Sequence, residues 1–365
     1  MPSPRFAVAT PEDDLAIRRL LRDNPMEGSI RLTFEREPDY FQGTELAGAD
    51  DETVTAFAGE RLLCMGRCSR RECWVDGEPT RVGYLAELRL DASARGRFAI
   101  LRDGYRFFHE QPPARATTLH FTSIAADNER ARRVLERGAR GMPRYGFLGE
   151  LTTLLVAVPR RAHPSNLEVQ AATPDDLPAL VNALNDHARR HHLAAAWTAD
   201  RLRSLERHGL PLNRFLLARR DGRIVAGGGL WDQRAFRQTV IRSYALALSR
   251  TRPLVNLAAL LFGSPRLPAP GTTLPHAFLS PLALGEGATN LLPEFVAAFF
   301  PLARRIGVEF LTLALPAADL RLAALRRRFS TRVYRSRLYR VHWPDETPVV
   351  LQNPATAFLP DVALL

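Results

Sequence analysis

A single carboxylate, Glu87, stands in the otherwise largely apolar stretch YLAELRL at 84–90. A carboxylate held in a cleft with a raised pKa can take a proton from a nucleophile near neutral pH. A structural ion pair with Arg89 or Arg81 would also explain this residue. Both interpretations, a general base and an ion-pair partner, stay open from the sequence.

The residues after Glu87 have the composition of an anion-binding turn. The run at 84–90 is typical of a strand covered on both faces, and the small, basic loop DASARGR follows at 91–97. Apolar residues then recur with helical spacing, at Phe98, Leu101, Tyr105 and Phe108. Free backbone amides and the dipole of a helix start attract anions, and the loop arginines add positive charge. The alternative is an ordinary strand, turn and helix with a solvated basic turn.

The composition predicts a globular protein with room for two domains. The chain has 365 residues, of which 46% are hydrophobic, and a formal net charge of +11. All 50 basic residues are arginine, and they are dispersed along the chain. A nucleic-acid-binding protein usually has its basic residues clustered on one face. We therefore expect no nucleic-acid partner, although a positive surface favours an anionic ligand such as a nucleotide-bearing cofactor.

The cysteines and the apolar runs predict a cytoplasmic protein. Three cysteines, Cys64, Cys68 and Cys73, are not a disulfide framework. No signal-peptide pattern is present, and the longest apolar runs are too short or too interrupted to span a bilayer, so we expect no membrane partner. No metal is expected, because the arginines beside His187 and His191 favour a solvated helix face over a metal site.

A pattern of three elements occurs twice in the chain. The segments TPED at 10–13 and TPDD at 173–176 each predict a capped helix start. The segments GERLLCMG at 59–66 and GRIVAGGG at 222–229 each predict a turn into a strand. A helix followed by a long strand then closes each copy, with the helices expected at 129–137 and 320–328. Three such pairs in the same order predict two copies of one α/β domain.

The repeat sets the expected domain boundaries. We expect an N-terminal domain at 1–160 and a C-terminal domain at 166–345, joined by the polar, proline-flanked linker PRRAHPSN. The second copy carries a proline-rich insertion at 250–273 whose apolar patch would suit an interface in a homo-oligomer. The tail at 346–365 is expected to be extended chain packed on the body.

The order of elements resembles the GNAT superfamily of CoA-dependent N-acyltransferases, in its tandem bacterial form. The segments that carry the resemblance are VGYLAELRLDASARGRFAILRDGYRFF at 82–108 and TSIAADNERARRVLERG at 122–138. The segment EREPDYF at 35–41 is similar to the substrate-side helix region of tandem members. The resemblance implies two tandem domains of the α/β class, each with a central mixed sheet flanked by helices.

The resemblance also implies roles for particular residues. Acetyl-CoA, or another short acyl-CoA, would be the cosubstrate, and Glu87 would take a proton from the attacking amine. The pantetheine arm and the pyrophosphate would lie on the residues that match the family's cofactor-binding motif, which are Leu88, Leu90, Arg95, Gly96, Arg97, Phe98 and Asn128. Tyr145 and Tyr84 are candidate proton donors, although most buried tyrosines only pack with the hydroxyl bonded.

Two positions depart from the family pattern. Phe98 stands where a second glycine is expected, and its ring could crowd a pyrophosphate because glycine normally permits close approach. Leu135 stands where many members place a tyrosine as general acid. In the second copy, Pro281 occupies the place of Glu87, and Glu286 replaces arginine in the loop GEGATN at 285–290. An acid there would repel a pyrophosphate, so we expect the second domain not to be catalytic.

These observations predict an N-acyltransferase that moves an acetyl or short acyl group from acyl-CoA to an amine of a small molecule or peptide. The alternative is a non-catalytic ligand-binding protein on a degenerate acyltransferase fold, to which Phe98 and Leu135 point.

Overall fold

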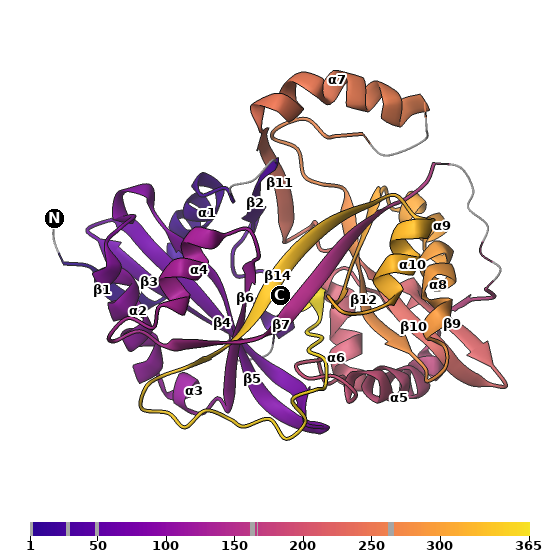
Figure 1. Ribbon diagram of the computed structural model, residues 1–365, viewed down its shortest axis with the longest axis horizontal. Helices are drawn as coiled ribbons and strands as arrows, with labels where there is room; N and C mark the ends of the chain where they lie inside the picture. Colours follow the sequence, from indigo (N-terminus) through magenta and orange to yellow (C-terminus); the bar gives the residue numbers. More distant parts are fainter. Residues whose placement is uncertain (1–2, 27–29, 48–50, 161–164, 166, 262–265) are drawn as a thin grey trace.

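One mixed β-sheet runs through the whole molecule. The computed structural model describes residues 3–26, 30–47, 51–160, 165, 167–261 and 266–365 (Figure 1). In these residues a 12-stranded sheet has the order β1-β3-β4-β5-β6-β14-β7-β13-β12-β10-β9-β8. The strands of the first half are β1 (Arg5–Val8), β3 (Glu52–Ala58), β4 (Arg61–Val75), β5 (Glu78–Leu90), β6 (Leu119–Ala125) and β7 (Arg144–Ala157). Those of the second half are β8 (Gln170–Ala171), β9 (Phe215–Arg220), β10 (Arg223–Trp231), β12 (His276–Leu284), β13 (Phe310–Pro316) and β14 (Thr331–His342). This α/β architecture with a mixed sheet confirms the predicted fold class.

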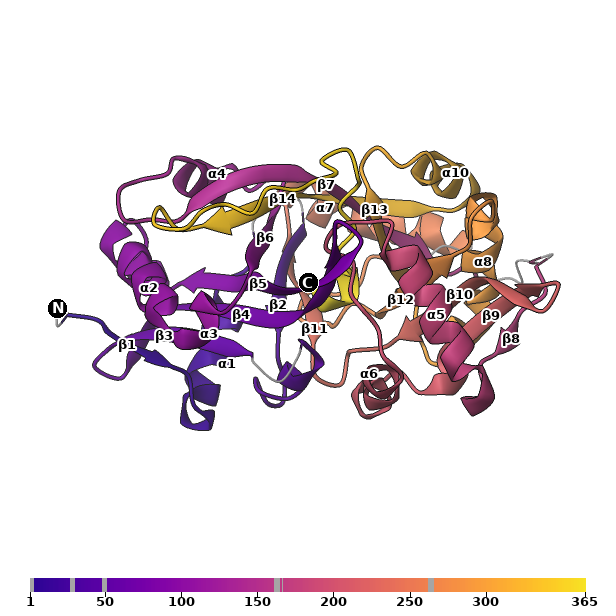
Figure 2. The same cartoon turned by 90° about the horizontal axis from the view of Figure 1, so that it is seen from below.

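Helices pack beside the sheet in both halves of the molecule (Figure 2). In the first half they are α1 (Asp14–Asp23), α2 (Phe98–Glu110), α3 (Pro112–Arg115) and α4 (Glu129–Glu136). In the second half they are α5 (Leu177–Ala188), α6 (Ala199–Ser204), α8 (Leu292–Ala298), α9 (Phe300–Arg305) and α10 (Arg321–Arg328). The repeated starts at Thr10 and Thr173 both form capping boxes, in which Asp13 and Asp176 bond back to the cap amide.

The two halves exchange their last strands. Strand β14, from the end of the second half, lies between β6 and β7, with Leu338 opposite Ser123. Strand β7, from the first half, lies between β14 and β13, with Leu154 opposite Leu313. Each half therefore completes its sheet with a strand of the other. The expected boundary at 160–166 stays a prediction, since 161–164 and 166 lie outside the described residues.

The C-terminal tail crosses the molecule as extended chain. Asp76, in the β4–β5 turn, accepts hydrogen bonds from the amides of Gln352 and Asn353 at 3.0 and 2.9 Å. Farther along, the amide of Leu359 bonds the carbonyl of His192 at 2.9 Å. The tail thus contacts both halves. The helices of the described residues include none long and apolar enough to cross a membrane.

A small lobe projects from the body. Strand β2 (Ile30–Glu35) pairs with β11 (Gln238–Tyr244), and helix α7 (Leu246–Leu261) packs on this ribbon (Figure 1). The helix region implied at 35–41 is wrong, because β2 ends at Glu35 and turns follow. The predicted insertion at 250–273 forms most of α7 and part of the return chain, with 262–265 outside the described residues.

Candidate functional site

Strands β5 and β6 begin as a parallel pair and then diverge. Their pairing runs from Val82 opposite Leu119 to Leu85 opposite Thr122, and it stops there, although β5 continues to Leu90. The Thr122 hydroxyl closes the last paired position by donating to the Leu85 carbonyl at 2.7 Å. Beyond this point the facing strand edges carry backbone groups that a bound chain can use as hydrogen-bond partners. We call this gap the β5–β6 wedge.

Glu87 lies at the bend that opens the wedge. Its φ is +53°, and the register between β4 and β5 shifts at this position, between Met65 and Arg67. Such a bulge increases the local twist and turns a strand away from its neighbour. A positive φ is uncommon for a residue with a side chain, so the contacts of Glu87 must hold this conformation.

Those contacts are arginines and a tyrosine. Arg36 donates to Oε1 of Glu87 from Nε and Nη2 at 2.9 and 2.6 Å, and the Tyr40 hydroxyl donates to Oε2 at 3.1 Å. Arg67 lies 3.8 Å from Oε1 and is also paired with Asp51. The ion-pair interpretation is therefore confirmed, with Arg36 and Arg67 in place of the expected Arg89 or Arg81.

The expected direction of the Glu87 pKa is wrong. Burial alone would raise the pKa, but the charges of Arg36 and then Arg67 outweigh burial and lower the pKa to about 2. A carboxylate with so low a pKa is a weak proton acceptor at neutral pH. Its geometry suits a fixed negative charge that positions Arg36 and Arg67.

Hydroxyl groups lie on both faces of the wedge. On one face, the Tyr84 hydroxyl is 2.7 Å from the Ser123 hydroxyl across the two strands. On the other face, the Tyr145 hydroxyl is 2.6 Å from the Tyr105 hydroxyl of α2, in the apolar cluster that contains Leu135. Burial raises the pKa of Tyr145 well above its ordinary value, so this hydroxyl stays protonated.

The exchanged strand β14 adds a tyrosine that the sequence did not reveal. Side chains alternate along a strand, so Tyr334 shares the face of Leu338, which lies opposite Ser123. Tyr334 is 38% exposed, and partial burial, followed by the nearby Tyr84, raises its pKa. No sequence pattern could place Tyr334 here, because the residue belongs to the other half. Arg36 and Tyr40, by contrast, lie in the segment at 35–41 that the family resemblance had placed on the substrate side.

The loop after β5 forms a compact turn. Asp91 accepts from the Ser93 amide at 2.8 Å, and Gly96 adopts a φ of +87°. A Cβ at Gly96 would meet nothing within 4 Å, so the loop has open space above it. The amides of Arg97 and Phe98 already donate to loop carbonyls at 3.1 Å, so these two could reach a pyrophosphate only after a local rearrangement. Phe98, the first residue of α2, is 36% exposed.

The remaining predicted residues lie along the same wedge. Leu88 and Leu90 pack against the cluster that contains Ala94 and Ile100, which attaches the end of β5 to the start of α2. Asn128 caps α4 just past the end of β6 by accepting from the Ala131 amide at 3.1 Å. The structure thus brings the predicted cofactor-binding residues to the rims of one gap, with Asn128 on the β6 side.

In the second half, strands β12 and β13 also diverge after a short parallel pairing, but the residues at the bend are uncharged. Strands β12 and β13 pair in parallel from His276 to Phe278. A bulge in β12 follows, where Ser280 and Pro281 lie opposite the single residue Gly229 of β10. Pro281 lies at this bulge, where the first half has Glu87. In the following loop Gly287 has a φ of +74°, and Glu286 extends into solvent, 3.5 Å from Arg190.

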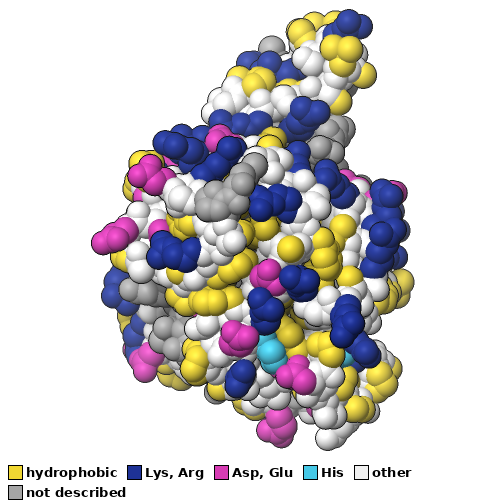
Figure 3. Space-filling view, turned by 90° about the vertical axis from the view of Figure 1, so that its left-hand side faces the viewer, with side chains coloured by type: hydrophobic (Ala, Val, Ile, Leu, Met, Phe, Trp, Pro, Cys, Tyr) yellow, Lys and Arg dark blue, Asp and Glu magenta, His cyan; other side chains and the backbone are white. Residues whose placement is uncertain are grey.

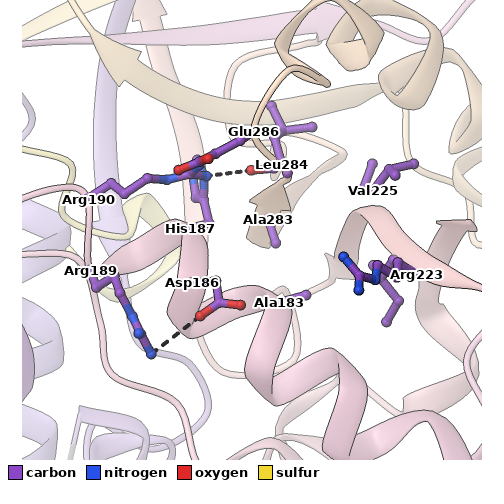
Figure 4. Close-up of a pocket in the computed structure, with 13 residues that line it drawn as sticks. Ala183, Asp186, His187, Arg189, Arg190, Arg223, Val225, Ala283, Leu284 and Glu286 are labelled. Carbon is purple, nitrogen blue, oxygen red and sulfur yellow. Dashed lines mark hydrogen bonds and ion pairs between the residues drawn. The ribbon is translucent and has the colours of Figure 1, made fainter. Parts of the chain in front are cut away.

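An open cavity of about 460 Å³ lies beside this second loop, between α5, β10 and β12 (Figure 4). Small residues such as Ala183 and Ala283 line its wall. Arg190 crosses its mouth and donates to the Leu284 carbonyl at 2.6 Å, and Arg189 pairs with Asp186 at 3.3 Å. The charged groups around this cavity are thus largely engaged with one another.

Among the histidines and cysteines that the structure describes, the burial of His187 differs from the sequence expectation. No cluster of three or more ligating side chains occurs in the part of the chain that the structure describes. The expected solvated face is wrong for His187, which is 7% exposed and whose pKa is lowered to about 3 by burial. All three cysteines are free and buried, and burial raises the pKa of Cys73 to about 11.

Comparison with solved structures identifies the fold. A GCN5-related N-acetyltransferase from Sphaerobacter thermophilus matches 92% of this chain and 95% of its own, with a TM-score of 0.56 and 16% identity. Saccharomyces cerevisiae N-myristoyltransferase with bound myristoyl-CoA matches 98% of this chain and 90% of its own, with a TM-score of 0.61 and 10% identity. Another structure of the yeast enzyme, with bound myristoyl-CoA and inhibitors, matches 99% and 87%, with a TM-score of 0.61 and 11% identity.

The chain therefore has the GNAT fold over nearly its whole length, and the predicted resemblance is confirmed at the level of fold. No family model and no curated protein sequence matches the chain.

Proposed function

We propose that this protein is an N-acyltransferase that moves an acyl group from acyl-CoA to an amine. The observation that carries the proposal is the β5–β6 wedge, whose unpaired strand edges lead directly into the Gly96 loop and the start of α2. An extended pantetheine arm can add to the β5 edge as a short strand would, and the loop with its arginines suits a pyrophosphate. The solved structures that share the fold are acyltransferases by name, which supports the same class.

In the proposed reaction, the amine nitrogen attacks the thioester carbonyl, the C–N bond forms, and the C–S bond breaks. The amine proton ends on the departing sulfur, so the step needs no further reactant. We propose that Tyr145, hydrogen-bonded to Tyr105, gives its hydroxyl proton to the departing thiolate and regains the proton that the attacking amine nitrogen loses. Glu87 holds Arg36 and Tyr40 at the bend of β5.

The donor is proposed as a short acyl-CoA, with acetyl-CoA as the first candidate. Free thiol release from acetyl-, octanoyl- and myristoyl-CoA, measured with a panel of small amines and N-terminal peptides, tests both the activity and the chain length. We expect amine-dependent thiol release that falls about tenfold or more in Tyr145→Phe. The matched control Tyr244→Phe removes a hydroxyl from the projecting lobe and should leave the rate unchanged.

Two results would count against this assignment. Acyl-CoA binding without thiol release for any amine would favour the non-catalytic alternative. Equal loss in Tyr145→Phe and Tyr244→Phe would remove Tyr145 from the chemistry.

A further inference from the structure

Helix α7 has apolar residues on two opposite faces. One face, with Leu248 and Val255, packs on the small core that Ile241 and Tyr244 form in the lobe. The other face carries Leu246, Leu254 and Leu257, which are 67%, 70% and 55% exposed. Spacings of eight and eleven residues place these leucines on one stripe of the helix. A stripe of this kind on a projecting lobe marks a docking surface.

The charge around this stripe has one sign. Between Asp232 and Glu286 the sequence contains no acidic residue. The arginines of the described lobe, which comprises β2, β11, α7 and 266–274, are Arg31, Arg242, Arg250, Arg252 and Arg266. The single described acid of the lobe, Glu35, is buried in an ion pair with Arg242. Hydrophobic and basic side chains accordingly lie together on the projecting lobe in Figure 3.

We propose that this stripe docks on an anionic lipid surface. The exposed arginines of the described lobe are Arg31, Arg250 and Arg266, whereas Arg242 and Arg252 are engaged within the lobe. Exposed leucines beside exposed arginines bind the interface of an acidic bilayer, because the leucines enter the headgroup boundary while the arginines meet phosphates. The helix lies at an extremity of the molecule, so a flat surface can reach its whole outer face (Figure 1). The inference is independent of the proposed acyl transfer and of any membrane-spanning segment.

A second copy of this chain fits the stripe less well. Two lobes meeting through α7 would bring two sets of arginines together without carboxylates to offset them, and like charges oppose such contact. A nucleic acid would use the arginines but not the three exposed leucines.

Co-sedimentation with vesicles tests the proposal on the full-length protein. Phosphatidylcholine vesicles with about 30% phosphatidylglycerol should bind the protein, and pure phosphatidylcholine vesicles should bind it weakly, because each arginine near an anionic surface adds attraction. Leu254→Ser with Leu257→Ser should reduce partitioning about tenfold or more, because both side chains lose their apolar contact with lipid. About 0.5 M salt should also weaken binding.

A matched control keeps the result specific to the stripe. Leu15→Ser with Leu320→Ser removes two leucines that are 58% and 90% exposed elsewhere, and should leave partitioning unchanged. Thermal unfolding should be unchanged in both double variants, since none of the four side chains belongs to a buried cluster. Absence of binding to acidic vesicles, or equal binding by the α7 double variant, would overturn the proposal. A dimer in sedimentation velocity that the α7 variant abolishes would also overturn it and identify a second copy as the occupant.

Discussion

The β5–β6 wedge of the first half and the β12–β13 divergence of the second both follow a short parallel pairing, and they differ in charge. At the bend, Glu87 collects Arg36, Arg67 and Tyr40, whereas Pro281 offers no polar side chain. In the following loops, the first half has arginine beside Gly96, and the second has Glu286 before Gly287. Each half therefore has a bulge after its parallel pairing. The first copy also places arginines within the loop itself, where they suit an anionic cofactor. We infer that the β5–β6 wedge binds the cofactor, and that the β12–β13 divergence has only a structural role.

The largest expected effect is on the free energy of unfolding, when the ion pair at the bend of β5 is broken. Arg36→Met leaves Glu87 buried without its main partner, and breaking a buried pair from one side costs roughly 3–5 kcal/mol. Chemical denaturation should therefore show a lower free energy of unfolding by about that amount. Arg203→Met is the control, because its pair with Asp200 is exposed and such a pair contributes at most about 1 kcal/mol. Equal losses in the two variants would mean that Glu87 is not held by charge.

The pH dependence of stability should report the same carboxylate. The pKa of Glu87 falls from 4.5 to about 2 on folding, so its contribution is present above pH 4.5 and is lost as pH falls toward 2. This contribution is about 3 kcal/mol. Glu87→Gln removes it, so the difference in unfolding free energy between wild type and variant should shrink by about that amount from pH 7 to pH 2. A difference that stays constant over this range would show that the carboxylate is not charged when folded.

The two loop glycines give a matched pair of variants for cofactor binding. Gly96 and Gly287 both have positive φ, and a Cβ at either would meet nothing within 4 Å. Gly96→Val and Gly287→Val therefore impose the same backbone strain in the two halves. Acyl-CoA affinity, measured by calorimetry, should fall about tenfold or more in Gly96→Val, because the loop that meets the pyrophosphate is distorted. A larger loss in Gly287→Val would place the cofactor in the second half.

The smallest effect is expected at the cavity of the second half. Ala183→Leu adds three carbons at its wall, where open volume is available. We expect an unfolding free energy within about 0.5 kcal/mol of wild type and an unchanged acyl-CoA affinity. A clear loss of acyl-CoA affinity would show that this cavity, and not the β5–β6 wedge, receives the cofactor.

The sequence predicted the elements better than their assembly. The capped starts at Thr10 and Thr173, the strand that holds Glu87 and the loop at 91–97 all follow from local patterns, and the structure has them. The exchange of β7 and β14 could not be predicted, because both strands have the same alternation and either could pair with β6 or β13.

The chemistry of Glu87 was missed for a related reason. Its pKa depends on Arg36 and Arg67, which are 51 and 20 residues away in the chain and reach Glu87 only in the folded molecule. Arg36 lies in a segment that the resemblance had marked, but as part of a helix. Arg89 and Arg81 were predicted as partners because they are close to Glu87 in the sequence. In the folded strand, the alternation of side chains and the bulge turn the Glu87 side chain toward residues of other segments.

Calorimetric titration with acetyl-CoA, with desulfo-CoA and ATP as controls, tests most directly whether only the first half binds the cofactor. The structure predicts saturable binding at one site per chain, retained in Gly287→Val and weakened in Gly96→Val. Two equivalent sites per chain would contradict the assignment of a structural role to the β12–β13 divergence. No binding at about millimolar acetyl-CoA, a concentration that detects even weak ligands, would contradict a cofactor role for the β5–β6 wedge.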